Sequence, residues 1–171
     1  MSSSFFGNLR KMDAFMRGMD KHYMVQVGIF GDKNPRGVAI KKVKGKLRSK
    51  YGNQDSGLTN ADIGAIHEFG SFTRHIPARS FLRMPINLKT KEIIQQASQG
   101  ATKLISEGNL MKVMMRLGIA AENAIQQAFA SRGFGTWKLD AESTRKRKGS
   151  DAPLIDTAQL RRSIASRVVP A

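Results

Sequence analysis

The amino-acid sequence predicts an α+β fold: a small antiparallel sheet packed against two long helices plus short helices, with a long basic loop. Residues 22–30 alternate apolar side chains with others, which is typical of a strand with one buried face. Residues 109–131 carry apolar side chains at alternating four- and three-residue spacings, which predicts a long, closely packed helix. Residues 87–106 predict the second long helix, which Gly100 weakens.

Length and composition limit the class of protein. A chain of 171 residues fits one domain, here residues 1–171, with enough length to bury a core. The chain has no cysteine, which excludes disulfides and cysteine-based metal sites. We expect no signal peptide and no membrane span, because no stretch is long and apolar enough.

The charge balance points to an acidic partner. The chain has 29 Lys and Arg residues against 13 Asp and Glu residues, a formal net charge of +16. Such a balance implies attraction to nucleic acid, a membrane surface or an acidic protein, without choosing among them.

The N-terminal residues 5–20 predict a short amphipathic helix. Its apolar side carries Phe5, Leu9, Met12 and Met16. We expect it to pack on the domain. A membrane-binding helix is the less favoured alternative, because Asp13 and Asp20 interrupt its basic face.

The most basic segment is residues 32–58. It holds eight basic residues and no acidic one between Lys33 and Lys50, with few apolar residues, so we expect a mobile basic loop or arm. A hairpin arm stays open as an alternative. The segment could lie along a phosphate backbone, order against an acidic neighbour, or simply remain solvated. The candidate contacts with DNA or an acidic partner are Lys41, Lys42, Lys44, Lys46, Arg48 and Lys50.

The densest run of specific residue types spans residues 63–86. Its first part predicts a short helix that Thr59 or Asn60 can cap. Pro77 and Pro85 disfavour helical geometry in the residues before them, so we expect an ordered, irregular loop with projecting arginines.

The C-terminal third is predicted to continue with a loop over residues 133–151. Trp137 is expected to anchor this loop on the core, with an interface role as the alternative. The basic run of the loop, residues 145–148, is interpreted as a solvated or subunit-contacting surface. A helix is predicted to start at Ile155–Gln159, capped by Asp156, and a strand is predicted over residues 166–169.

Two blocks of this sequence resemble a known family. The first reads His67-Glu68-Phe69-Gly70-Ser71, then Ile76-Pro77-Ala78-Arg79-Ser80-Phe81-Leu82-Arg83. The second reads Leu154-Ile155-Asp156-Thr157-Ala158-Gln159-Leu160-Arg161-Arg162-Ser163-Ile164. In this order they resemble the tail-completion (neck) proteins of long-tailed bacteriophages, in which a glycine usually stands at the place of Ala158. The segment around Trp137 also looks like the related virion-morphogenesis proteins.

The resemblance implies a structural role in the virion. It implies a homo-oligomeric ring, expected to be a hexamer, that completes the tail and joins it to the head connector. The implied partners are further copies of the chain, the tail terminator or tail tube, and head-connector proteins; contact with packaged DNA stays open, and no membrane partner or cofactor is expected. The implied location is the neck of the virion, after assembly in the host cytoplasm.

Six residues are candidates for contacts with a subunit or partner. They are Arg74, Arg79, Phe81, Arg83, Arg161 and Arg162. Arginine can bind carboxylates through two parallel hydrogen bonds, which fixes register as well as adding affinity. The equally weighted alternative for Arg79 is an intramolecular pair with Glu68 or Asp62. On the interface reading, Arg79→Ala would fold normally and impair head–tail joining.

No catalytic signature is present, and we do not expect an enzyme. His67-Glu68 begins like a zinc-protease motif, but Ser71 stands where the second histidine is required. We interpret His67 and Glu68 as a polar helix face or as a pair that orients residues 71–79. The alternative function is a basic nucleic-acid-binding protein acting outside the virion, although no reading helix or aromatic-rich sheet supports it.

Overall fold

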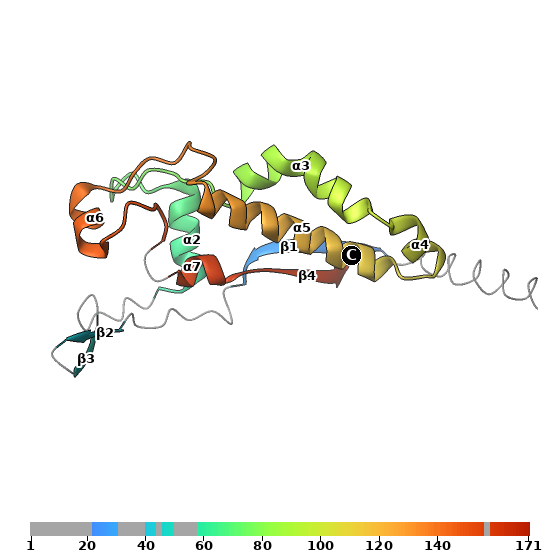
Figure 1. The fold of residues 1–171 in the computed structure, drawn as a ribbon, viewed down its shortest axis with the longest axis horizontal. Helices are drawn as coiled ribbons and strands as arrows, with labels where there is room; N and C mark the ends of the chain where they lie inside the picture. Colours follow the sequence, from blue (N-terminus) through green and yellow to red (C-terminus); the bar gives the residue numbers. More distant parts are fainter. Residues whose placement is uncertain (1–21, 31–39, 44–45, 50–57, 156–157) are drawn as a thin grey trace, which may run out of the picture. The chain divides into compact units, whose positions relative to one another are not determined.

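The computed structural model describes residues 22–30, 40–43, 46–49, 58–155 and 158–171, and shows an α+β chain (Figure 1). The strands are β1 (Tyr23–Ile29), β2 (Ile40–Val43), β3 (Lys46–Ser49) and β4 (Ile164–Pro170). The helices are α2 (Asn60–Phe69), α3 (Arg83–Ser98), α4 (Ala101–Ser106), α5 (Leu110–Ala130), α6 (Glu142–Lys148) and α7 (Gln159–Arg162). The helix predicted over residues 5–20 lies outside the described residues.

The chain divides into two compact units whose segments interleave along the sequence. The first unit includes Ile86–Ile125, Ser166–Ala171 and the start of β1 up to Val27. The second includes Gln126–Ala165 and the residues from Gly28 to Pro85. The long helix α5 contributes residues to both units. A single domain over residues 1–171 stays a prediction.

The first unit packs the β1–β4 sheet against α3 and α5. The N–H of Ala171 donates to the carbonyl of His22 over 2.9 Å, which makes the two strands antiparallel. The core cluster consists of Ile93 on α3 and Ala120, Ala121 and Ala124 on α5, with Val27 and Leu117 packed against it. Gly118 allows close approach, since a Cβ there would lie 2.5 Å from Ser166 Oγ. The predicted sheet-on-helix arrangement and both of its strands are therefore confirmed.

The predicted second long helix, residues 87–106, differs from the observed one in two ways. Gly100, at φ +68°, separates α3 from α4, as the weakness of glycine in helices suggested. At the other end, α3 begins at Arg83 and includes Pro85. The expectation of irregular chain up to this proline was wrong, because first-turn N–H groups have no intrahelical partner and proline is tolerated there.

The second unit has an aromatic core that includes Trp137. Phe129 packs edge-to-face on Phe81 and on Trp137, with ring centroids 5.4 and 5.6 Å apart. The indole N–H of Trp137 donates to the carbonyl of Ser80 over 3.3 Å, and the indole covers Gly133, where a Cβ would lie 2.3 Å from the ring. Trp137 therefore anchors its loop on the core, as predicted.

Two basic segments form regular structure. The run predicted as part of a loop over residues 133–151 forms α6, so that prediction was wrong. Glu142 lies in its first turn and four basic residues in its last, which suits the helix dipole.

In the basic segment 32–58, β2 and β3 pair antiparallel, with Ile40 opposite Ser49. The described residues of this segment therefore form the hairpin that the sequence left open as an alternative. Lys44 and Lys50 lie outside the described residues.

Candidate functional site: a basic pocket between two sequence blocks

The helix α2 begins with a capping box. Thr59 Oγ1 accepts from the N–H of Asp62 over 3.2 Å, and the Asp62 carboxylate accepts from the N–H of Thr59 over 2.8 Å. The side-chain and backbone hydrogen bonds from Thr59 lower the pKa of Asp62. Of the two predicted caps, Thr59 and Asn60, the structure has Thr59 as the N-cap. The cap sets where α2 begins and therefore the direction in which its later side chains point.

Glu68, in the last turn of α2, organises the start of α3. Its side chain is 4% exposed. The carboxylate accepts five hydrogen bonds: from the N–H groups of Phe81, Leu82 and Arg83, from Ser80 Oγ and from Arg83 Nε, at 2.6–3.2 Å. Burial alone would raise the pKa of Glu68, but the hydrogen bonds from Ser80, Leu82 and Arg83 outweigh it and lower the pKa. Glu68 therefore orients residues 80–83, whereas the sequence suggested residues 71–79.

Arg79 is buried, and its guanidinium binds groups of the same chain. Its side chain is 3% exposed, and Nη2 lies 2.9 Å from Asp140 Oδ1. Nε donates to the carbonyl of Lys138 over 2.8 Å, and Nη2 to that of Leu139 over 3.1 Å. Burial lowers the pKa of Arg79, and the charge of Asp140 opposes this shift. The predicted pairing with Glu68 or Asp62 was wrong.

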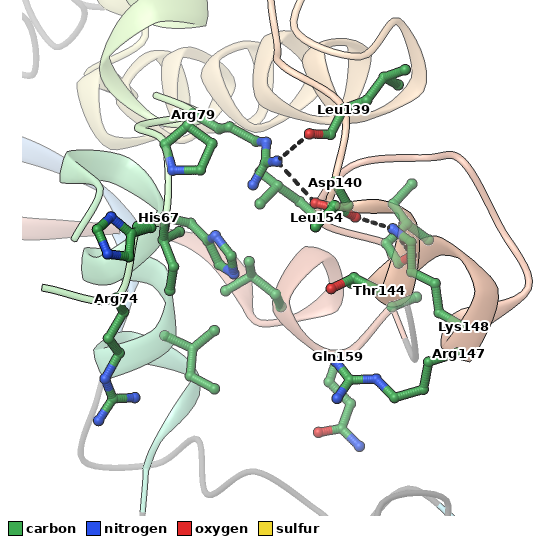
Figure 2. Close-up of a pocket in the computed structure, with 18 residues that line it drawn as sticks. His67, Arg74, Arg79, Leu139, Asp140, Thr144, Arg147, Lys148, Leu154 and Gln159 are labelled. Carbon is green, nitrogen blue, oxygen red and sulfur yellow. Dashed lines mark hydrogen bonds and ion pairs between the residues drawn. The ribbon is translucent and has the colours of Figure 1, made fainter. Parts of the chain in front are cut away.

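Lys148 completes this cluster from α6. Its ammonium pairs with the other oxygen of Asp140 and donates to the carbonyl of Ala152, and its side chain is 4% exposed. Figure 2 shows Arg79 and Lys148 converging on Asp140 from opposite sides. The prediction that residues 145–148 form a solvated or subunit-contacting surface is therefore wrong for Lys148. The signal that sequence reasoning missed is Asp140, one of two acidic residues that shortly precede the basic run 145–148.

These side chains line a pocket of about 390 Å³ within the second unit (Figure 2). The first sequence block contributes His67, Ile76, Pro77 and Arg79, and the second contributes Leu154, Ile155, Ala158, Gln159 and Leu160. Ile63, Arg74 and His75, which lie beside or within the gap of the first block, also line the pocket. The two blocks that carry the family resemblance are thus brought together at one place. The lining includes four cationic side chains, Arg74, Arg79, Arg147 and Lys148, and one carboxylate, Asp140.

The second block turns through an unusual residue. The prediction of a helix start at Ile155–Gln159 with Asp156 as cap was wrong: α7 begins at Gln159, and its N-cap is Ala158. Ala158 has φ +58°, a left-handed conformation that favours glycine. This is the position at which the resembled family usually has glycine. Asp156 itself lies outside the described residues.

The six predicted contact residues separate into three groups by burial. Phe81 is fully buried in the aromatic core and Arg79 in the ion-pair cluster, so neither presents a surface to a partner in this chain. Arg161 is partly buried and bonds Gln126, with Nε to Oε1 at 2.6 Å. Arg74 and Arg162 are exposed, and so is Arg83, at 63%, which also bonds Glu68. The surface candidates are therefore Arg74, Arg83 and Arg162.

The described residues contain no group of three or more His, Asp or Glu side chains arranged to hold a metal ion. None of the helices that the structure describes combines the length and apolar character needed to cross a bilayer. Comparisons with family models, with curated proteins and with solved structures find no match for this chain.

Proposed function

We propose that this protein is a structural component of the neck of a tailed bacteriophage, where copies form a ring that joins tail to head. The observation that carries the proposal is the meeting of the two family-like blocks in one pocket and core. Their distinctive residues have packing roles: Glu68 caps α3 and Arg79 binds Asp140. In a structural protein, buried charged residues such as Glu68 and Arg79 hold the fold together, whereas catalytic residues must be accessible to a substrate.

Surfaces for contact between copies are available in the first unit. Exposed apolar side chains lie on α5 at four-residue intervals, at Met111, Met115 and Ile119, and they are 41–55% exposed. Such a stripe on a helix is typical of protein–protein contacts. Closure of a ring would cover in each copy a surface that a monomer leaves in water.

The test is the assembly state of the purified chain, measured by sedimentation velocity and negative-stain electron microscopy. We expect closed rings of one size, and we expect Ile119→Gln to shift them toward monomers. Lys112→Gln, an exposed polar change on the same helix, is the matched control and should leave the rings intact. A chain that remains monomeric at every concentration tested contradicts the ring proposal.

A second candidate, a nucleic-acid-binding protein, is favoured by the net charge of +16 and by the basic β2–β3 hairpin. It predicts tight binding to random duplex DNA, with an affinity that falls steeply as salt rises. Weak DNA binding by a ring-forming chain would exclude it.

A further inference from the structure

The most exposed large apolar side chain in the described part of the chain is Phe72, which is 93% accessible. A single exposed phenylalanine is ordinary on a protein surface. Phe72, however, lies three residues from Phe69, which is 66% exposed, and both rings line one shallow groove. Ile76, Pro77 and Ala78 supply the rest of its apolar surface.

The backbone that carries Phe72 is fixed. Ser71 and Ile76 exchange both backbone hydrogen bonds at 2.9 Å, and the N–H of His75 donates to the carbonyl of Phe72 over 3.1 Å. His75 has φ +50°, a left-handed conformation that is uncommon outside glycine and that these bonds maintain. Because the tip is already ordered, a partner that covers Phe72 gains apolar contact with little loss of backbone freedom.

Packing also fixes the base of the tight hairpin formed by residues 71–76. Gly70 has φ +78°, and a Cβ there would lie 2.9 Å from the carbonyl oxygen of Ile76 and from the nitrogen of Ala78. The N–H of Arg79 donates to the carbonyl of His67 over 2.7 Å, which ties the far end of the loop to α2. The groove is therefore a formed feature of the second unit.

The edges of the groove are positively charged. The sequence has no carboxylate from residue 69 to residue 91, and Glu68 is buried and already accepts five hydrogen bonds. Arg83, whose Nε bonds Glu68, lies 4.6 Å from the centroid of the Phe69 ring, and Arg74, two residues after Phe72, is exposed. An apolar floor with cationic edges is complementary to an acidic partner. As the occupant of this groove a second copy of the chain fits less well, because it offers only 13 acidic residues among 29 basic ones.

We propose that the groove lined by Phe69, Phe72, Ile76, Pro77 and Ala78 binds a short segment of another protein, in which apolar side chains stand between aspartate or glutamate residues. Phe72 is the anchor that the apolar side chains cover. Arg74 and Arg83 bind the flanking carboxylates. This binding site does not depend on the neck assignment, since it follows from exposure, backbone order and charge alone.

The probes are three labelled synthetic peptides of equal length, measured by fluorescence anisotropy against the full chain. The first combines leucine and isoleucine with glutamate, the second replaces each glutamate by glutamine, and the third contains glutamate without apolar residues. We expect the first to bind, with an affinity that falls as salt rises, and the other two to bind at least about tenfold more weakly.

Variants then locate the site. Phe72→Ala should weaken binding of the first peptide by at least about tenfold, and Arg74→Gln should weaken it less and flatten its salt dependence. Leu139→Ala is the matched control: Leu139 is 51% exposed in the same unit but outside the groove, and its removal should leave the affinity unchanged. Thermal unfolding of each variant confirms that it remains folded.

Three results would overturn the proposal. Equal binding of the glutamate-only peptide would mean attraction by charge alone, without a groove. Unchanged affinity of a folded Phe72→Ala variant would exclude the anchor. Self-association that disappears in Phe72→Ala, with no peptide binding by the wild type, would show that a second copy occupies the groove.

Discussion

Replacing Glu68 by glutamine tests the central physical claim about the second unit, that one buried carboxylate holds the start of α3. Two of the five hydrogen bonds reach Oε2, from the N–H groups of Phe81 and Leu82, and three reach Oε1. Glutamine keeps one acceptor oxygen. If that oxygen serves the three donors at Oε1, the amide NH₂ faces two N–H groups and both lose their acceptor.

The expected loss of unfolding free energy follows from these contacts. A buried donor without a partner costs about 1–3 kcal/mol, and the lost charge removes a favourable interaction with the α3 N-terminus of about 0.3–1 kcal/mol. With two such donors the sum is roughly 2–7 kcal/mol for Glu68→Gln, a large share of the about 5–15 kcal/mol that stabilises a typical domain.

The assay is denaturant unfolding followed by tryptophan fluorescence. Trp137 is the only tryptophan in the chain and its indole bonds the carbonyl of Ser80, next to the Glu68 contacts. Glu92→Gln is the control. Glu92 lies on α3, is 54% exposed and pairs only with Lys89 among described residues, so its loss should change stability by less than about 0.5 kcal/mol. A loss below about 1 kcal/mol in Glu68→Gln, at unchanged m, would refute the reasoning.

The pH dependence of the unfolding free energy of the wild type and of Glu68→Gln supplies an independent check. The folded-state pKa of Glu68 lies below its ordinary value of 4.5, so the stability it contributes is present above that pH. The contribution is lost as pH falls from 4.5 through the folded-state pKa. The stability difference between wild type and Glu68→Gln should therefore shrink in acid, and a difference that stays constant to below pH 4 would contradict the shift.

Three further substitutions have definite expected outcomes. Arg79→Ala should cost roughly 2–4 kcal/mol of unfolding free energy, because it leaves two carbonyls without their donor and Asp140 with one cation; a fully stable variant would return Arg79 to the list of surface contacts. Ala158→Gly should raise stability by about 0.5–1 kcal/mol, since glycine relieves the left-handed conformation at φ +58° against a smaller entropic cost; a lower melting temperature would contradict that geometry. Gly118→Ala should destabilise by about 1–3 kcal/mol, because its Cβ would meet Ser166 Oγ at 2.5 Å; unchanged calorimetric unfolding would show that the strand can shift.

The sequence by itself determined the elements whose signals are local. The period-two alternation of β1 and the regular spacing in α5 follow from burial of one face, and each can be read within a single segment. The capping of α2 by Thr59 is likewise a property of a few adjacent residues. Gly100 was recognised as a weak point, but the sequence predicted one helix there and the structure has two. The anchoring role of Trp137 was also predictable, because one large indole in a polar loop has few other uses.

Only the tertiary structure decided how the charged residues are used. Glu68 bonds residues 12–15 positions away, and Arg79 bonds Asp140, 61 positions away, so neither partner has a signature in the local pattern. A charged side chain looks the same in sequence whether it faces solvent or a buried partner, and the choice depends on which segments folding brings together. The exposure of Phe72 also depends on tertiary packing. The sequence alone suggests that a phenylalanine is buried, and only the packed structure shows that Phe72 is not.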